Sequence, residues 1–201
     1  MDKAPLFITG IGTGIGKTII AAVLTESLKA DYWKPIQSGD LDNSDTLKVK
    51  SLISNTLSKF FPEAYRLTQP YSPHKSADLD GIIIDPAKIM MPATDNQLII
   101  EGAGGLMVPL NNNFLMIDLI QQLKADVVLV IKHYLGSINH SLLSLEALKS
   151  RNIPVRAVIY NGDRDEYSES IINNYISCKK IYVDEINDLT KAGIAAQKIE
   201  L

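Results

Sequence analysis

A glycine-rich stretch near the start of the chain constrains the fold more than any other segment. The apolar run from Leu6 to Ile8 leads into Gly10-Ile-Gly-Thr-Gly-Ile-Gly-Lys-Thr18, and a segment without glycine or proline follows from Ile19 to Leu24. A strand, a glycine loop, a Gly-Lys-Thr triplet and a helix in this order are the context of a phosphate-binding loop. The stretch therefore predicts a site for a nucleoside triphosphate.

The residue types in this loop suit phosphate binding. Glycines leave backbone N–H groups free to face phosphate oxygens, and a helix N-terminus adds unpaired N–H donors and the positive end of a dipole. Lys17 can reach the terminal phosphates, and the Thr18 hydroxyl can bind Mg²⁺. A glycine-rich β-turn with a chance lysine is the weaker interpretation, because Gly-Lys-Thr stands in register after a strand. The residues predicted to bind the nucleotide here are Gly12, Thr13, Gly14, Ile15, Gly16, Lys17 and Thr18.

Apolar strands alternate with helical patterns along the rest of the chain. Strands are expected at 31–33, 97–101, 127–131, 155–160 and 180–183, and helices at 17–30, from 45, 85–89, 114–123, 139–150, 167–176 and 184–196. Residues 36–40 are expected to form a loop, and five prolines between 58 and 95 favour short helices joined by turns. The alternation predicts an α/β chain with the three-layer P-loop NTPase fold and a mostly parallel central sheet. We expect one domain over residues 1–201.

Composition excludes several classes of function. The chain has 20 Lys and Arg against 23 Asp and Glu, a net charge of -3, and its basic residues are dispersed, which argues against a nucleic-acid partner. The single cysteine, Cys178, rules out an internal disulfide and a cysteine-rich metal site. The sequence has no signal-peptide core behind a basic start, and no apolar run approaches a membrane span. We therefore expect a cytoplasmic protein.

Two acids are candidate metal ligands. Glu101 ends an apolar strand, where a carboxylate is costly unless it is paired or binds a cation. We predict that it binds Mg²⁺ at the edge of the sheet rather than capping a helix or bridging loops. Asp45 is a second candidate ligand, and its alternative role as a plain residue of a helix start is equally well supported.

Two further residues follow predicted strands or lie near them. Lys34 is followed by Pro35, so its ammonium is expected to point over the edge of the sheet. It either stabilises a transferring phosphoryl group or is a solvated lysine at a strand end. Ser38 has no histidine-and-acid arrangement to activate it, so we expect a hydrogen bond to substrate rather than nucleophilic chemistry.

Several stretches together resemble the dethiobiotin synthetase family. Besides the phosphate loop, they are Trp33-Lys-Pro-Ile-Gln-Ser-Gly39, Asn43-Ser-Asp45, Tyr71-Ser-Pro-His74, Glu101-Gly-Ala-Gly-Gly105 and Leu135-Gly-Ser-Ile-Asn-His140. They stand in the family's order and span the chain as far as Asn161. The resemblance implies an ATP-dependent cyclo-ligase of biotin biosynthesis. Such an enzyme converts 7,8-diaminononanoate and CO₂, or bicarbonate, to dethiobiotin through a carbamate and a mixed carbamic-phosphoric anhydride.

The resemblance also implies a role for each matching position. Lys17 and Lys34 would be the catalytic lysines, and Thr18, Asp45 and Glu101 would bind Mg²⁺. Thr13, Lys34 and Ser38 would contact the diamine or its carbamate. For ATP, the remaining implied positions are Glu101, Gly102, Gly104 and Asn161, with Asn161 at the base. For the substrate carboxylate, which would bind across a homodimer interface, they are Gly136, Ser137, Ile138 and Asn139.

The chain departs from the family at three places. Gly12 and Gly14 stand where the family often has acidic residues, and the lysine at 132 lies farther from the following Leu-Gly than is usual. Many members have a proline-containing loop over the base after the last strand, and its absence after 183 predicts relaxed base selectivity.

Two other functions remain open. A cobyrinate-type amide-forming synthetase typically has an additional amidotransferase domain, and a nucleotide-switched partner-binding ATPase usually has a second lysine early in the loop.

Overall fold

A seven-stranded parallel sheet forms the centre of the computed structural model, which describes residues 4–201. Its strands lie in the order β11 (Lys179–Val183), β10 (Val155–Asn161), β9 (Asp126–Ile131), β1 (Leu6–Gly10), β6 (Leu98–Gly105), β2 (Asp31–Trp33) and β4 (Phe60–Phe61). Every neighbouring pair in this sheet is parallel. The predicted fold, an α/β chain around a mostly parallel sheet, is therefore confirmed. The first three residues of the expected domain lie outside the described range.

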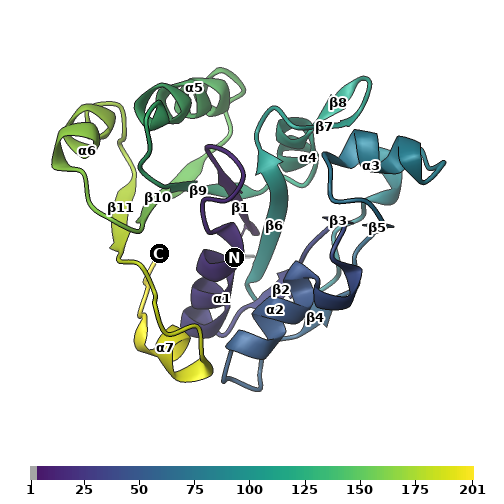
Figure 1. Cartoon of the computed structure of the whole chain (residues 1–201), viewed down its shortest axis with the longest axis horizontal. Coiled ribbons are helices and arrows are strands. Elements are labelled where there is room, and N and C mark those ends of the chain that lie inside the picture. Colours follow the sequence, from purple (N-terminus) through teal and green to yellow (C-terminus); the bar gives the residue numbers. More distant parts are fainter. Residues whose placement is uncertain (1–3) are drawn as a thin grey trace.

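Helices cover both faces of the sheet (Figure 1). In this view α4 (Met116–Gln122), α5 (Ser137–Ser150) and α6 (Glu166–Asn173) lie above the strands, and α1 (Lys17–Leu28) and α7 (Lys191–Ala196) lie below them. The other helices are α2 (Asp45–Leu52) and α3 (Pro73–Leu79), with 3₁₀ turns η1 (Leu41–Asn43) and η2 (Pro86–Lys88). Two small sheets pair β3 (Ile36–Ser38) with β5 (Tyr65–Leu67), and β7 (Pro109–Asn111) with β8 (Phe114–Leu115). Within residues 4–201, none of these helices has the length and apolarity to cross a bilayer.

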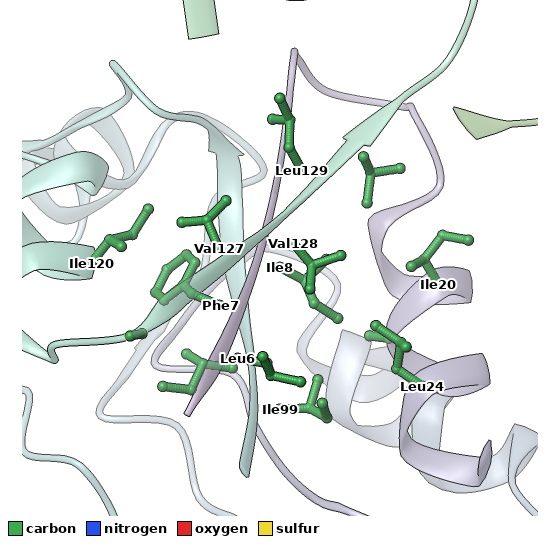
Figure 2. Packing of buried hydrophobic residues seen from close by; sticks show 14 of the residues in the cluster. Leu6, Phe7, Ile8, Ile20, Leu24, Ile99, Ile120, Val127, Val128 and Leu129 are labelled. Atoms are coloured by element: carbon green, nitrogen blue, oxygen red, sulfur yellow. The ribbon is translucent and has the colours of Figure 1, made fainter. Parts of the chain in front are cut away.

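The central strand β1 is buried between two layers of helices. Successive side chains of a strand point to opposite faces of the sheet. Accordingly, Phe7 lies toward Ile120 of α4, whereas Ile8 lies toward Ile20 and Leu24 of α1 (Figure 2). All residues of β1 are buried, as is typical of parallel strands covered on both faces. The core therefore fixes the strand from which the phosphate loop begins.

β1 and β6 approach each other closely where the site begins. A Cβ atom at Gly102 would lie 2.6 Å from a ring carbon of Phe7, which is itself completely buried. A larger residue at Gly102 would therefore have to displace the Phe7 ring. Further along, Gly10 pairs with Gly105 after a shift in register between the two strands. This close approach places the residues that follow Gly10 beside those at the end of β6.

Several segments differ from the sequence-based expectation, and β6, for example, continues to Gly105, past the expected end of the strand at Glu101. The predicted loop at 36–40 contains β3, which pairs with β5 from the segment expected to hold only helices and turns. Pairing between short strands distant in sequence depends on tertiary contacts that a local pattern does not reveal. The capped helix expected from Asp85 is a 3₁₀ turn. Residues 184–190 are irregular rather than helical, because the Thr190 side chain caps α7 by accepting a hydrogen bond from the Gly193 N–H group.

Candidate active site

The phosphate loop leaves β1 at Gly10 and enters α1 at Lys17. Ile15 is buried and fixes the loop to the core, while Gly16 has a φ angle of 87°. A Cβ atom at Gly16 would also lie 2.2 Å from Nδ2 of Asn161, so only glycine fits at this position. Among the described residues, 4–201, no side chain caps the N-terminus of α1. Its first N–H groups are therefore available to an anion, as the motif predicts.

Lys17 folds back over the loop that precedes it. Its Nζ atom donates a hydrogen bond of 2.8 Å to the Gly12 carbonyl, and only 8% of the residue is exposed. Burial, together with the nearby charge of Lys34, lowers the pKa of Lys17 to about 8, against the attraction of Glu101 and Asp45. A polyanion bound at the loop would favour the charged form of this side chain.

A buried ion cluster lies beside the loop. The Nζ atom of Lys34 is 2.7 Å from Oδ2 of Asp45 and 3.0 Å from Oε1 of Glu101. The Thr18 hydroxyl donates to Oε1 of Glu101, and the Tyr32 hydroxyl donates to Oε2, both at 2.8 Å. Glu101 is only 1% exposed, and both of its carboxylate oxygens have partners. These contacts offset the cost of burying its charge.

The members of this cluster shift one another's pKa values. Burial opposes the charge on Lys34, but the attraction of Glu101 and Asp45 outweighs burial and raises the pKa of the ammonium. Burial also opposes the charge on Asp45, and the attraction of Lys34 outweighs it and lowers the pKa of that carboxyl. Burial and the adjacent Glu101 carboxylate raise the pKa of Tyr32 well above its usual range. Lys34 is therefore charged at neutral pH, and Tyr32 keeps the proton that it donates.

The acids of the cluster have the chemistry of a magnesium site. Mg²⁺ prefers hard oxygen ligands and commonly takes one or two carboxylates together with phosphate oxygens. Asp45 and Glu101 approach the same Lys34 nitrogen, and the Thr18 hydroxyl touches the same Glu101 oxygen. Across residues 4–201, no three His, Cys, Asp or Glu side chains gather into a metal cage. Thr18, Asp45 and Glu101 therefore fit a Mg²⁺ ion that is shared with phosphates.

The cluster opens into a cavity of about 690 Å³. Of the residues predicted for ATP, metal or substrate, those in its wall are Thr13, Gly14, Gly16, Lys17, Thr18, Lys34, Ser38, Asp45, Glu101 and Gly104. The Ser38 hydroxyl is buried without a hydrogen-bond partner in the part of the chain that the structure describes. Because buried polar groups are normally paired, this hydroxyl is available to a ligand. The phosphate loop, the acids and a free hydroxyl thus share one cavity.

Other predicted residues lie behind or away from this wall. Gly12 and Gly102 contribute their carbonyl groups, which accept hydrogen bonds from Lys17 and from Lys34 respectively. The Ile15 carbonyl accepts a hydrogen bond of 2.8 Å from Nδ2 of Asn161. The four residues predicted for the substrate carboxylate are at the N-terminus of α5 and do not line the cavity of their own chain: Gly136, Ser137, Ile138 and Asn139.

The segment after β11 lies beside Asn161. The Gly162 N–H group donates to the Val183 carbonyl at 2.8 Å, and Nζ of Lys132 is 3.7 Å from Oε1 of Glu185. Residues 184–190 thus form a loop at this edge of the sheet, where the sequence predicts a helix. This loop contains no proline, so the basis of the prediction of relaxed base selectivity is unchanged and it stays a prediction.

Sequence reasoning missed three residues of the site. Tyr32 donates to Glu101, Oε1 of Gln37 accepts a hydrogen bond of 3.2 Å from the N–H group of Asp45, and Tyr71 lines the cavity. Tyr32 lies in β2 and Lys34 directly follows this strand, and both side chains reach Glu101. Gln37 and Tyr71 lie in stretches that resemble the family, but the resemblance gave neither residue a role.

Solved structures share this fold. A ParA family ATPase from Chlorobium tepidum matches with a TM-score of 0.55 at 15% identity, over 96% of this chain and 98% of that one. The MinC:MinD cell division protein complex of Aquifex aeolicus matches with a TM-score of 0.56 at 15% identity, over 95% of this chain and 86% of that one. At such identities the likeness shows the fold alone.

Sequence relatives are more specific. A family model described as an AAA domain matches residues 4–192. The ATP-dependent dethiobiotin synthetase BioD of Christiangramia forsetii is 56% identical over 167 residues, which cover 83% of this chain and 80% of the relative. The protein of the same name from Cytophaga hutchinsonii is 46% identical over 197 residues, which cover 97% of this chain and 95% of the relative. The chain therefore belongs to the ATP-dependent dethiobiotin synthetase family, as its motifs predict.

Proposed function

We propose that this cavity is the site of the Mg²⁺- and ATP-dependent carboxylation and ring closure of 7,8-diaminononanoate to dethiobiotin. The observation that supports the proposal best is the contact of Lys34 with Asp45 and Glu101 in the cavity that Lys17 also lines. Charged groups fixed in a water-poor site stabilise charge that develops during phosphoryl transfer. The cavity therefore suits a reaction in which the γ-phosphate of ATP moves to a small substrate.

The chemistry requires no protein nucleophile. One substrate amine captures CO₂ and loses a proton, which forms a carbamate. A carbamate oxygen attacks the γ-phosphorus, the bond to the ADP oxygen breaks, and a mixed carbamic-phosphoric anhydride forms. The second amine attacks the carbonyl carbon, the carbon–oxygen bond to phosphate breaks, and the ring closes with loss of a proton. The protein supplies positioning and charge stabilisation, as is usual for phosphoryl transfer.

Four side chains and the N-terminus of α1 would provide this positioning and charge stabilisation. Lys17 and the uncapped N–H groups of α1 would hold the phosphates of ATP. Lys34 would stabilise charge on the transferring group from the same cavity. The free hydroxyl of Ser38, together with Thr13, would bind the diamine or its carbamate. The proposed catalytic residues are thus Lys17 and Lys34, and the others orient substrate.

Thr18, Asp45 and Glu101 are the residues that we assign to Mg²⁺. The two carboxylates and the hydroxyl supply hard oxygen ligands, and the remaining positions around the ion would go to phosphate oxygens and water. When bound, Mg²⁺ supplies positive charge that neutralises phosphate oxygens.

We assign Asn161 to recognition of the adenine base. Its Nδ2 atom donates to the Ile15 carbonyl, which orients the amide and leaves Oδ1 and one N–H for a ligand. An acceptor beside a donor matches the N6 and N7 edge of adenine. The loop that follows β11 lies beside Asn161, where it would cover the base.

We further infer a homodimer in which α5 of one subunit serves the cavity of the other. The N-terminus of α5, at residues 136–139, would attract the substrate carboxylate, yet it does not line the cavity of its own chain. Nearby Met107, Leu135 and Leu143 are exposed apolar side chains, which are typical of an interface. Each subunit would be a single domain over residues 1–201, and as an ATP-dependent biosynthetic enzyme it would work in the cytoplasm.

The reaction is tested by measuring dethiobiotin formation and ADP release with ATP, Mg²⁺, bicarbonate and the diamine. We expect both products to require all four components, and Lys17→Ala to abolish them in a folded protein. Lys29→Ala, which removes an exposed lysine at the far end of α1, serves as the matched control. ATP hydrolysis at an equal rate without the diamine would favour a nucleotide-switched ATPase instead.

The shared site is tested by mixing two inactive variants. Lys17→Ala removes a phosphate contact, and Asn139→Asp places a negative charge where the substrate carboxylate would bind. If the two contributions come from different subunits, random mixing should restore about a quarter of wild-type activity, because half of the dimers then contain one intact site. Mixing that restores nothing would place both contributions in one subunit.

A further inference from the structure

The Tyr32 hydroxyl contacts the Glu101 carboxylate from behind the wall of the cavity. β2 and β6 are neighbours in the sheet, with Tyr32 opposite Ile99, so Glu101 lies two residues further along β6. The hydroxyl donates a hydrogen bond of 2.8 Å to Oε2 of Glu101, and both residues are buried. Among residues 4–201, the lining of the cavity includes Glu101 but not Tyr32. Tyr32 therefore acts on the acid and not on a ligand in the cavity.

The packing around Tyr32 fixes the place of its hydroxyl. The residue is completely buried, and β2 pairs with β4 on the side opposite β6, where Tyr32 is the partner of Phe60. The rings of Tyr32 and Phe60 lie 5.7 Å apart at a tilt of 45°. A buried ring that is packed against a second ring has little room to move. Glu101 therefore meets a hydrogen-bond donor at a fixed position.

The two carboxylate oxygens of Glu101 have different partners. Oε1 accepts hydrogen bonds from Lys34 at 3.0 Å and from Thr18 at 2.8 Å, so it faces a residue that we also assign to Mg²⁺. Oε2 has Tyr32 as its partner among the residues that the structure describes. Without that hydroxyl, Oε2 would be a buried, charged oxygen without a donor, and the carboxylate would turn toward the donors at Oε1 or toward water. The Tyr32 contact therefore decides which oxygen faces the cation site.

We propose that Tyr32 is a positioning residue of the metal site, whose hydroxyl holds Oε2 of Glu101 and thereby presents Oε1 to Mg²⁺. Carboxylates that bind metals are commonly oriented by such hydrogen bonds, and loss of one typically costs about 10- to 100-fold in metal affinity or activity. This inference rests on the proposed assignment of Glu101 to Mg²⁺ and adds the residue that orients the acid. Tyr32 touches neither the substrates nor the reacting atoms.

The decisive variant is Tyr32→Phe, which removes one oxygen atom and leaves the ring beside Phe60 in place. We expect the Mg²⁺ concentration for half-maximal ADP release to rise about tenfold, the lower end of the range for a lost contact of this kind. At saturating Mg²⁺, kcat and the KM for the diamine should stay within about threefold of the wild type, because the variant keeps every group that contacts the substrates. An unchanged Mg²⁺ requirement would refute the positioning role.

Tyr160→Phe is the matched control. Tyr160 is also buried, and its hydroxyl donates a hydrogen bond of 3.0 Å to Oδ1 of Asn173, away from the cavity. Both substitutions remove a buried, hydrogen-bonded hydroxyl and should lower the melting temperature, but only Tyr32→Phe should change the Mg²⁺ requirement. Combined with Glu101→Gln, Tyr32→Phe should raise that requirement no further, because the hydroxyl acts through the carboxylate. An equal rise in Tyr160→Phe, or a full further rise in the double variant, would overturn the proposal.

Binding of Mn²⁺ in the presence of ADP gives a readout that needs no turnover. The electron paramagnetic resonance signal of free Mn²⁺ falls when the ion binds, and the same titration with ADP alone is the reference. The Kd for Mn²⁺ should be about tenfold higher in Tyr32→Phe than in the wild type, and unchanged in Tyr160→Phe.

The outcomes of this titration separate the two proposals. Equal affinity for Mn²⁺ in the wild type and Tyr32→Phe would overturn the positioning role, and so would a wild type that binds no Mn²⁺ beyond that bound by ADP alone. A wild type that binds Mn²⁺ but makes no dethiobiotin would refute the proposed function, and the Kd values would still decide the role of Tyr32.

Discussion

Binding of ATP should be accompanied by uptake of a proton near pH 8. Burial and the neighbouring Lys34 lower the pKa of Lys17 to about 8 in the ligand-free protein. The phosphate loop that contains this side chain would receive a polyanion, which favours the charged ammonium and raises its pKa. A group whose pKa rises on binding takes up protons wherever the free form is partly neutral.

The size of the effect follows from the pKa of the free form. With a pKa of about 8, roughly half of the Lys17 side chains are neutral at pH 8 and about a tenth at pH 7. Binding should therefore take up about half a proton per site at pH 8 and about 0.1 at pH 7. ATP affinity should fall as pH rises above 8, by up to about tenfold or 1.4 kcal/mol for each pH unit. Below pH 7 this contribution to the affinity should be constant.

Isothermal titration calorimetry measures the uptake directly. The heat of ATP binding, recorded at one pH in two buffers with different ionisation enthalpies, differs by the number of protons exchanged. Titrations at pH 7 and pH 8, each with and without Mg²⁺, separate Lys17 from proton release caused by the metal. The γ-phosphate of ATP has already lost its proton at pH 8 and does not contribute there.

Two variants identify the group that titrates. Lys17→Arg keeps a positive charge at every pH used, because a guanidinium does not lose its proton, and should bind ATP without uptake at pH 8. Lys48→Arg, at a more exposed position on α2, should behave as the wild type. Absence of uptake in the wild type at pH 8, or the same uptake in Lys17→Arg, would refute the reasoning.

Three further predictions concern the acids and the base. Glu101→Gln keeps the shape of the side chain but loses its charge, so the Mg²⁺ concentration for half-maximal ADP release should rise about tenfold or more. An equal loss of diamine affinity, measured without metal, would contradict this prediction. Lys34→Met removes the ammonium that pairs with the buried Glu101 carboxylate, so the free energy of unfolding in urea should fall by about 3 kcal/mol and be partly restored by Mg²⁺. Unchanged stability would refute the ion-pair argument. With the single oriented amide of Asn161 at the base, kcat/KM should be higher for ATP than for GTP by no more than about tenfold, and this preference should be lost in Asn161→Ala. A thousandfold preference in the wild type would contradict the prediction.

Much of the site could be predicted because a parallel sheet collects the residues that follow its strands at one edge. Lys34 follows β2 and Glu101 lies within β6, and these two strands are neighbours, so the two side chains meet at 3.0 Å. The phosphate loop follows β1, on the other side of β6. An apolar run, a glycine turn and a charged residue can each be recognised in the local sequence, and the order of the strands in the sheet brings the residues that follow them together.

The features that sequence reasoning missed depend on contacts between distant segments. β3 forms because Ile36–Ser38 can pair with Tyr65–Leu67, and neither segment has the length or alternation of a strand by itself. The late start of α7 depends on one cap, Thr190, in a stretch that is otherwise compatible with a helix.

The close approach of Gly102 to Phe7 has a consequence for the genetics of biotin synthesis. A methyl group at Gly102 would press on a fully buried ring, and overpacking of this kind typically costs about 1–3 kcal/mol. Such a loss leaves a protein folded when cool and unfolds part of it when warm. Among biotin auxotrophs, alleles at Lys17 should therefore be null at every growth temperature, whereas a Gly102→Ala allele should be conditional. A single substitution of a glycine in a core strand would thus make synthesis of the vitamin depend on the growth temperature.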